Sequence, residues 1–169
     1  MPSRKPAGKS APAKAIQWPK LFASFIACFA AAGFGSFFTA SAIPTWYAAL
    51  SKPFFAPPNW LFGPAWTLLY ILMAVSLYLV WSKGFSKNRK PIFLFAIQLF
   101  LNALWSLAFF GLRNPAAGFA VIVLLWISIV ATMLAFKKAD KKAAWLLVPY
   151  ILWVSFASVL NFAVMLLNP

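Results

Sequence analysis

Residues 46–81, WYAALSKPFFAPPNWLFGPAWTLLYILMAVSLYLVW, decide the fold. The first half is rich in proline and aromatic residues and carries one charge, Lys52, which predicts a loop that folds over an apolar surface. The second half is an uninterrupted apolar run. Its stripe of large side chains at helical spacing consists of Trp66, Tyr70, Met73, Leu77 and Trp81. We therefore expect a lid-like loop, followed by a helix that forms one wall of a ligand cavity.

The composition indicates an integral membrane protein. Of 169 residues, 64% are hydrophobic and 9% are charged, whereas soluble domains carry about 25% charged residues. Asp140 is the only acidic residue, against 15 lysines and arginines that cluster between apolar runs. This placement favours anionic lipid headgroups over nucleic acid as the partner of the basic segments.

The apolar runs predict an all-α bundle of five transmembrane helices. The expected spans are 21–43, 64–81, 91–110, 116–136 and 143–167, which suit a hydrocarbon core of about 30 Å. Residues 1–19 are expected to form a basic disordered tail, or the start of a targeting segment, ahead of a membrane domain at 20–169. Pro149 should kink the last helix and free the carbonyl of Trp145.

A ridge of small residues runs along the first span. Its members, Ala23, Ala27, Ala31 and Gly35, recur at every fourth position. Such a ridge permits close approach of another helix, either in a homodimer or within one bundle.

The basic residues also predict an orientation. Thirteen of the fifteen lie in the N-terminal tail, the second-to-third loop and the fourth-to-fifth loop, which a five-span chain places on one side. Lys52 and Arg113 lie on the other side. The positive-inside rule then places the N-terminus in the cytoplasm.

Three spans carry polar and aromatic residues on a single face. These are Trp66 and Tyr70 in the second span, Gln98, Asn102 and Trp105 in the third, and Tyr150, Trp153, Ala157 and Asn161 in the fifth. Facing one another, they would form an aromatic pocket with a few hydrogen-bonding groups, typical of a site for a flat apolar ligand. Two alternatives to a ligand pocket remain. The amides could instead form hydrogen bonds that hold the helices together, and the tryptophans could form belts at the membrane–water interfaces.

Several chemistries are excluded by what the spans lack. None of the five contains Asp, Glu, Lys, Arg or His. The chain therefore has no intramembrane carboxylate relay, no histidine metal site and no Ser-His-Asp set. We expect no required cofactor and no metal.

Short motifs along the chain resemble the TspO/MBR family, the tryptophan-rich sensory and translocator proteins. The motifs are WYAALSKP, PPNW and FGPAW in the loop and second span, QLFLNALW and FFGLR in the third, and LLVPYILWVSFASVLNF in the fifth. They occur in order, and the resemblance covers about residues 21–168.

The resemblance implies a five-helix bundle, often a homodimer, with a pocket closed by the first loop. It implies binding of porphyrins and related tetrapyrroles, sterols, and isoquinoline or benzodiazepine-type compounds. The implied pocket residues are Tyr47, Pro58, Trp66, Tyr70, Asn102, Trp105, Trp153, Ala157 and Asn161. No basic residue follows Asn161, so the sterol-recognition pattern of animal members is missing and a bacterial membrane is the expected location.

The favoured hypothesis is a membrane-embedded binding protein or sensor for tetrapyrroles, with Arg113 meeting a propionate. A second is an enzyme-like, light- and oxygen-dependent degradation of porphyrin, in which Trp66 and Trp153 would be the catalytic candidates. A tetrapyrrole or lipid transporter ranks third, since the chain shows no inverted repeat and no buried charge. A structural lipid-organising protein is the remaining alternative.

Overall fold

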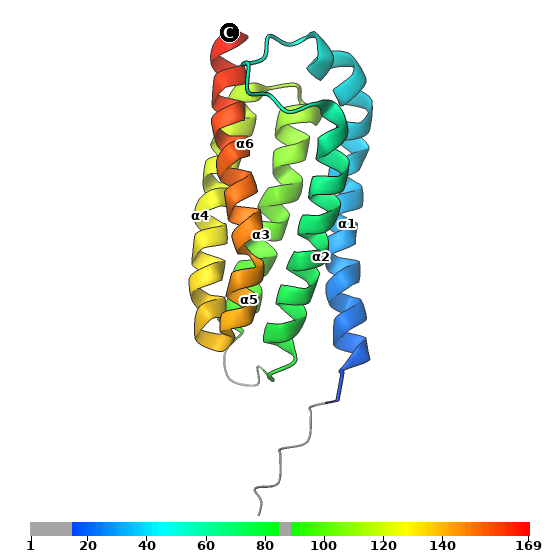
Figure 1. The fold of residues 1–169 in the computed structure, drawn as a ribbon, viewed down its shortest axis with the longest axis vertical. Coiled ribbons are helices and arrows are strands. Elements are labelled where there is room, and N and C mark those ends of the chain that lie inside the picture. The colour runs from blue at the N-terminus through cyan, green and yellow to red at the C-terminus, as the bar shows by residue number, and fades with distance from the viewer. Residues whose placement is uncertain (1–14, 85–88) are drawn as a thin grey trace, which may run out of the picture.

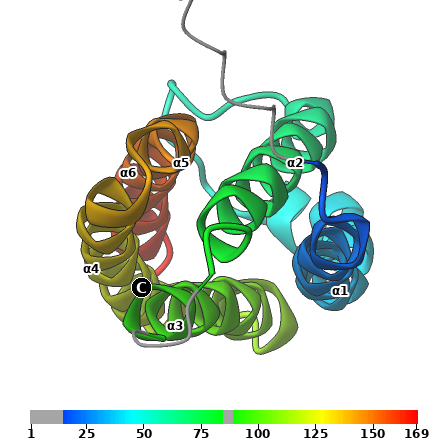
Figure 2. The same ribbon diagram turned by 90° about the horizontal axis from the view of Figure 1, so that it is seen from below.

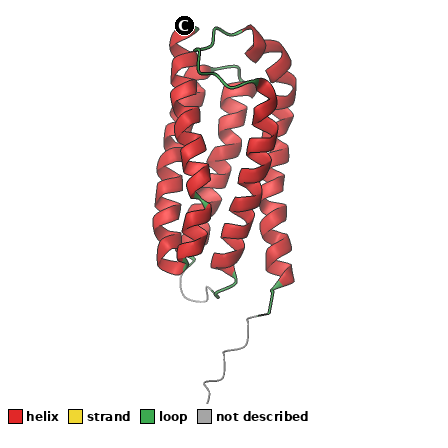
Figure 3. Ribbon diagram, in the orientation of Figure 1, coloured by secondary structure: helices red, strands yellow, loops and turns green. Residues whose placement is uncertain are grey.

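A computed structural model describes residues 15–84 and 89–169 of the chain. Its elements are α1 (Trp18–Ala42), η1 (Ile43–Tyr47), η2 (Asn59–Leu61), α2 (Phe62–Trp81), α3 (Lys90–Ser106), η3 (Leu107–Gly111), α4 (Pro115–Ala139), α5 (Lys141–Leu146) and α6 (Val148–Leu167). In the described part every regular element is helical (Figure 3). Most of the predicted basic tail lies outside the described residues, and α1 already begins at Trp18.

The prediction of five spans is confirmed for the described part of the chain. Five helical segments are long and apolar enough to cross a membrane: Trp18–Tyr47, Asn59–Trp81, Lys90–Gly111, Pro115–Ala139 and Lys141–Leu167. They run up and down along one long axis (Figure 1). α1, α3, α4 and α6 each have a proline at the first or second position, where its missing N–H leaves no hydrogen bond unmade.

The helices form a closed bundle when viewed from its end (Figure 2). α1 packs on α2 and α3, α3 on α4, α4 on α6, and α5 closes the ring against α2. The interior holds fully buried apolar side chains such as Met73 and the stacked pair Phe95 and Phe136, whose ring centroids lie 5.7 Å apart. Large apolar side chains also cover the outside; Phe37 is 77% exposed. An apolar exterior is what a lipid-facing surface requires.

The first span is longer than the sequence predicted. We expected it to end at Ile43, before Pro44, and placed Trp46 and Tyr47 in the loop; that boundary is wrong. The helix continues past Pro44 through the π-helical turn η1, and a wider turn of this kind accommodates the missing N–H of a proline. The Lys52 ammonium caps the extended helix by donating to the carbonyls of Tyr47, Ala48 and Leu50 at 2.8–3.0 Å.

The shortened loop, residues 50–58, crosses the end of the bundle toward the C-terminus (Figure 1). Ser51 and Asn168 join the two by a reciprocal pair of hydrogen bonds, each 3.0 Å long. Phe55 packs edge-on against Phe156 of α6. The loop therefore packs on α6, and none of residues 50–58 lines the cavity between α1, α2 and α3 that it was predicted to close.

Gly35 and Gly118 are among the glycines that mark close approaches between helices. A Cβ on Gly35 would lie 2.9 Å from the Ser106 hydroxyl oxygen, so this end of the small-residue ridge packs against α3 of the same bundle. A Cβ on Gly118 would lie 2.8–2.9 Å from Phe109 and 3.0 Å from the Asn161 amide oxygen.

The fifth span is interrupted at Leu147, two residues before Pro149, where the proline predicted a kink. The short α5 before it is held by contacts in its N-terminal half. Ser76 of α2 donates a 2.7 Å hydrogen bond to the Ala143 carbonyl. Asp140 accepts hydrogen bonds from the backbone N–H groups of Lys142 and Ala143, as an N-cap, and forms a 2.8 Å ion pair with Lys83.

Gly118→Ala should destabilise the bundle by about 1–3 kcal/mol, because the new methyl group overlaps Phe109 and Asn161. Gly33→Ala is the matched control, since nothing lies within 4 Å of its Cβ position. Thermal unfolding in detergent would measure both. Equal midpoints for the two variants would contradict the packing described here.

Asp140 predicts an acid-dependent loss of stability. Partial burial raises the pKa of its carboxyl, but hydrogen bonds from Lys83 and from two backbone N–H groups outweigh this and leave the pKa below its ordinary value. The ionised form is therefore favoured by folding, and this contribution is lost as the pH falls through the lowered pKa. Asp140→Asn keeps a good N-cap and loses the ion pair, so we expect a cost of about 1 kcal/mol or less at pH 7. The wild type and the variant should converge in stability once the pH has fallen below the lowered pKa; a constant difference at all pH values would contradict the assignment.

Candidate ligand-binding site

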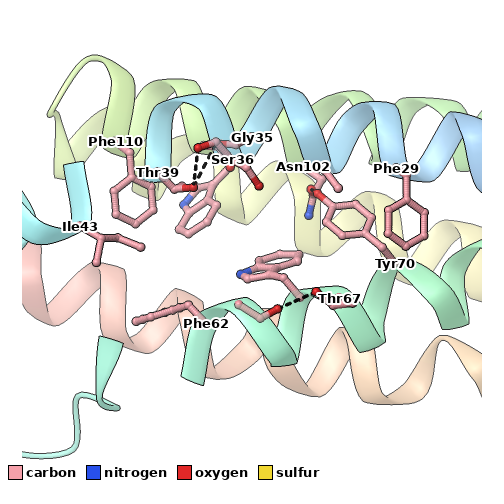
Figure 4. Close-up of a pocket in the computed structure, with 15 residues that line it drawn as sticks. Phe29, Gly35, Ser36, Thr39, Ile43, Phe62, Thr67, Tyr70, Asn102 and Phe110 are labelled. Carbon is pink, nitrogen blue, oxygen red and sulfur yellow. Dashed lines mark hydrogen bonds between the residues drawn. The ribbon is translucent and has the colours of Figure 1, made fainter. Parts of the chain in front are cut away.

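A cavity of about 220 Å³ lies between α1, α2 and α3, in the half of the bundle nearest the loop 50–58 (Figure 4). The residues that line it are Phe29, Ala32, Gly35, Ser36, Thr39, Ile43, Phe62, Gly63, Trp66, Thr67, Tyr70, Asn102, Trp105, Ser106 and Phe110. None of these described side chains is charged. The cavity suits an apolar molecule with a few hydrogen-bonding groups and offers no metal ligand set.

Aromatic rings form the inner walls of the cavity. Trp66 of α2 and Trp105 of α3 lie 6.3 Å apart with an angle of 30° between their planes. Trp66 also packs 5.7 Å from Tyr70, and Trp105 packs 5.8 Å from Phe110. A flat aromatic molecule could stack on such offset rings, which favour parallel and edge contacts at these distances.

A buried hydrogen-bond chain forms the polar side of the cavity. The Tyr70 hydroxyl donates to the Asn102 amide oxygen at 2.5 Å, and the Asn102 amide nitrogen donates to the Tyr150 hydroxyl at 3.0 Å. The chain links α2, α3 and α6, and all three side chains are buried. The predicted alternative, that an intramembrane amide joins helices, is therefore correct for Asn102, which also lines the cavity.

A second buried amide orients Trp105. The Trp105 indole N–H donates to the Asn161 amide oxygen at 3.1 Å, and the Asn161 amide nitrogen donates to the Pro115 carbonyl at 2.8 Å. Both hydrogen-bonding groups of the Asn161 amide are thus engaged with the protein. Asn161 acts on the cavity through Trp105 and does not line it.

The other predicted residues of the fifth span also lie behind the cavity wall. Trp153 packs 6.3 Å from Phe62 and 5.9 Å from Phe156. Tyr150 is fully buried and packs edge-on against Trp66. Ala157 is buried but, like the other two, does not line the cavity. The three predicted stripes therefore come together, but the side chains from α6 lie behind those that line the cavity.

The predicted residues from the two loops are not brought to the cavity. Pro58 is exposed and directly precedes η2, and Arg113 is exposed in a left-handed backbone conformation with φ of 51°. Tyr47 belongs to η1 and is buried against Phe62, Phe109 and Phe110. None of these three predicted residues lines the cavity.

Two buried polar groups have no hydrogen-bond partner among the described residues: the Tyr47 hydroxyl and the Gln98 amide. Gln98 is 1% exposed and lies one helical turn before Asn102, but it is not part of the cavity lining. An unpaired buried polar group costs about 1–3 kcal/mol. Gln98 thus departs from its predicted place beside the ligand.

The side of the cavity formed by α1 was missed by the sequence reasoning. Gly35, Ser36 and Thr39 line it from this helix, and Thr39 donates only to carbonyls of its own helix at Gly35 and Ser36. The available signal was a group of small and hydroxylated residues in an otherwise apolar span, since polar groups in membranes face the bundle interior.

The fold and the cavity define a multi-pass membrane protein: a five-helix bundle with an aromatic, uncharged internal site. Its sequence matches the model of the TspO/MBR family over residues 24–167. The chain belongs to this family.

Relatives span archaea, bacteria and animals. The "Tryptophan-rich protein TspO" of Archaeoglobus fulgidus is 52% identical over 149 residues, covering 88% of this chain and 97% of that protein. The protein of the same name from Chlorobaculum tepidum is 51% identical over 144 residues, covering 84% and 91%. The human "Translocator protein" is 41% identical over 124 residues, covering 70% and 72%.

Asn102→Leu should destabilise the bundle by about 1–3 kcal/mol, because it leaves the Tyr70 and Tyr150 hydroxyls without a partner. Ser158→Ala is the control, since its hydroxyl donates only to the Val154 carbonyl of its own helix. Denaturant or thermal unfolding of both variants, and of Tyr70→Phe alone and combined with Asn102→Leu, gives a double-mutant cycle. Additive losses at Tyr70 and Asn102 would contradict a shared hydrogen-bond chain.

Proposed function

We propose that this protein binds porphyrins and related flat hydrophobic molecules in the cavity between α1, α2 and α3. The observation that carries the proposal is the offset pair Trp66 and Trp105 beside the Tyr70–Asn102 hydrogen bond, within an uncharged cavity. Rings supply stacking area, and the hydroxyl and amide supply polar contacts that orient a ligand. Membership of a family with members named tryptophan-rich sensory protein and translocator protein supports a role in sensing or carrying such a molecule.

The size of the cavity constrains how a tetrapyrrole would bind. Its volume of about 220 Å³ is below the ~300–1,000 Å³ of pockets for drug-sized ligands. Binding therefore requires lining side chains to move outward. Thr67 and Phe29 are exposed, and Gly63 has no atom within 4 Å of its Cβ position, so the α1–α2 side has the room that such a movement needs.

Filling the cavity tests the proposal. Ala32 lines the cavity from α1, whereas Ala30 is exposed on the same helix and does not line it. We expect Ala32→Phe to raise the Kd for protoporphyrin at least about tenfold, a loss of ~1.4 kcal/mol, and Ala30→Phe to leave it within about twofold. Tryptophan quenching titrations in the dark measure both, and Trp66→Phe should weaken the quenching as well.

Two outcomes would contradict binding at this site. Linear, non-saturable quenching in the wild type would mean that porphyrin partitions into detergent. Equal weakening by Ala32→Phe and Ala30→Phe would place the ligand on the outer surface of α1.

Light-dependent porphyrin degradation is a second candidate, favoured by the position of Trp66 at the cavity. Trp153 lies behind Phe62, so the two proposed catalytic residues are not equivalent. Under light and dioxygen, this function requires product in excess of protein and greater sensitivity to Trp66→Phe than to Trp153→Phe. Product limited to one equivalent would leave binding as the function.

The cellular setting is part of the proposal. The excess of basic residues at one end supports a cytoplasmic N-terminus, with the cavity in the opposite half of the membrane. Bacterial and archaeal relatives support a prokaryotic membrane. Gly35 packs inside the bundle, so a homodimer would need a contact surface that does not include it. Ala27 of the same small-residue ridge is exposed and could belong to such a surface.

A further inference from the structure

Two grooves flank the C-terminal end of α4, at the end of the bundle opposite the cavity. The α3–α4 groove, of about 790 Å³, is lined by residues that include Leu94, Ala131, Leu134 and Lys138. The α4–α5 groove, of about 280 Å³, is lined by residues that include Leu134, Lys137, Lys141 and Trp145. Each groove is apolar along its length and carries lysines in its lining.

The two grooves share one residue, Leu134. Lys137 and Lys138 follow it at i+3 and i+4. Both therefore lie one helical turn closer to the C-terminal end of α4 than Leu134, and on either side of it. Lys137 lines one groove and Lys138 the other. Leu134 is therefore a ridge, with an apolar channel and a cation on each side.

The positive charge of this end is not neutralised locally. Asp140 is the only acidic residue in the sequence, and it is engaged by Lys83 at 2.8 Å. Lys137, Lys138 and Lys141 are exposed. An anionic partner would meet these charges without competing with an internal carboxylate.

The grooves lie at the depth of lipid headgroups. Trp145, which lines the α4–α5 groove, is 73% exposed, as expected of a tryptophan at the membrane–water boundary. Leu134, which lies farther from this end of the bundle than the lysines, is 59% exposed. Cations at the outer end of an apolar groove are complementary to a lipid, whose phosphate lies at the membrane surface and whose acyl chain extends into the bilayer.

We propose that this end of α4 binds one anionic glycerophospholipid with two phosphates and four acyl chains. One phosphate meets Lys138, the other meets Lys137 and Lys141, and the acyl chains lie in the two grooves on either side of Leu134. The shared ridge and the paired cations favour a single lipid with two phosphates over two separate lipids. This site is independent of the cavity between α1, α2 and α3.

The test compares one-lysine variants in each groove with a matched control. Lys138→Gln alters the α3–α4 groove, Lys141→Gln alters the α4–α5 groove, and Lys142→Gln removes the same charge from an exposed residue that lines neither. Binding of tetraoleoyl cardiolipin to the full chain in detergent is followed by native mass spectrometry, with dioleoyl phosphatidylglycerol and phosphatidylcholine as competitors.

We expect a single cardiolipin per protein in the wild type. Lys138→Gln and Lys141→Gln should each weaken that same complex about fivefold, as ~1 kcal/mol per lysine near an anionic lipid predicts. Lys142→Gln should change it by less than about twofold.

Three results would overturn the proposal. Equal weakening by all three variants would indicate general surface charge. Two phosphatidylglycerols bound as tightly as one cardiolipin, with each variant losing one of them, would indicate two separate single-phosphate sites. Equal retention of phosphatidylcholine would show that the grooves do not select a phosphate charge.

Discussion

The structure depends on a constraint imposed by the bilayer: inside a span a polar side chain has no water to bond, and a partner in another helix both satisfies the polar group and joins the two helices. Tyr70, Asn102 and Tyr150 meet this requirement together and join α2, α3 and α6. The Trp105 indole bonds to the Asn161 amide, which bonds in turn to the Pro115 carbonyl, and these contacts join α3, α6 and α4. These five side chains fix the relative rotation of four helices at the depth of the cavity.

The same contacts give the cavity its character. Asn102 and Tyr70 are engaged with one another, so the polar side of the cavity is already organised and carries no charge. The indole N–H of Trp105 is directed away to Asn161, which leaves its ring to face Trp66. The stability of the bundle and the proposed ligand recognition therefore depend on one set of residues, and a change at Asn102 is expected to affect both.

The two ends of the bundle differ in chemistry. At one end, the loop 50–58 is held to the C-terminus by Ser51 and Asn168, and Lys52 is occupied in capping a helix. At the other end, lysines surround the last turn of α4 and Asp140 is engaged with Lys83. Charge is thus concentrated at one membrane surface, while the uncharged cavity lies toward the other.

The sequence by itself determined the number of spans, their approximate bounds and the importance of Trp66, Tyr70, Asn102 and Trp105. Hydrophobic length and helical spacing are local properties, so a single chain displays them.

The tertiary structure decided which faces meet. It placed α1 on the cavity and Trp153, Ala157 and Asn161 behind it. It also carried the first helix through Pro44 by way of a π-helical turn, and Lys52 caps the end of that extended helix. Contacts between helices depend on rotation and packing, which the spacing of residues along one helix does not encode.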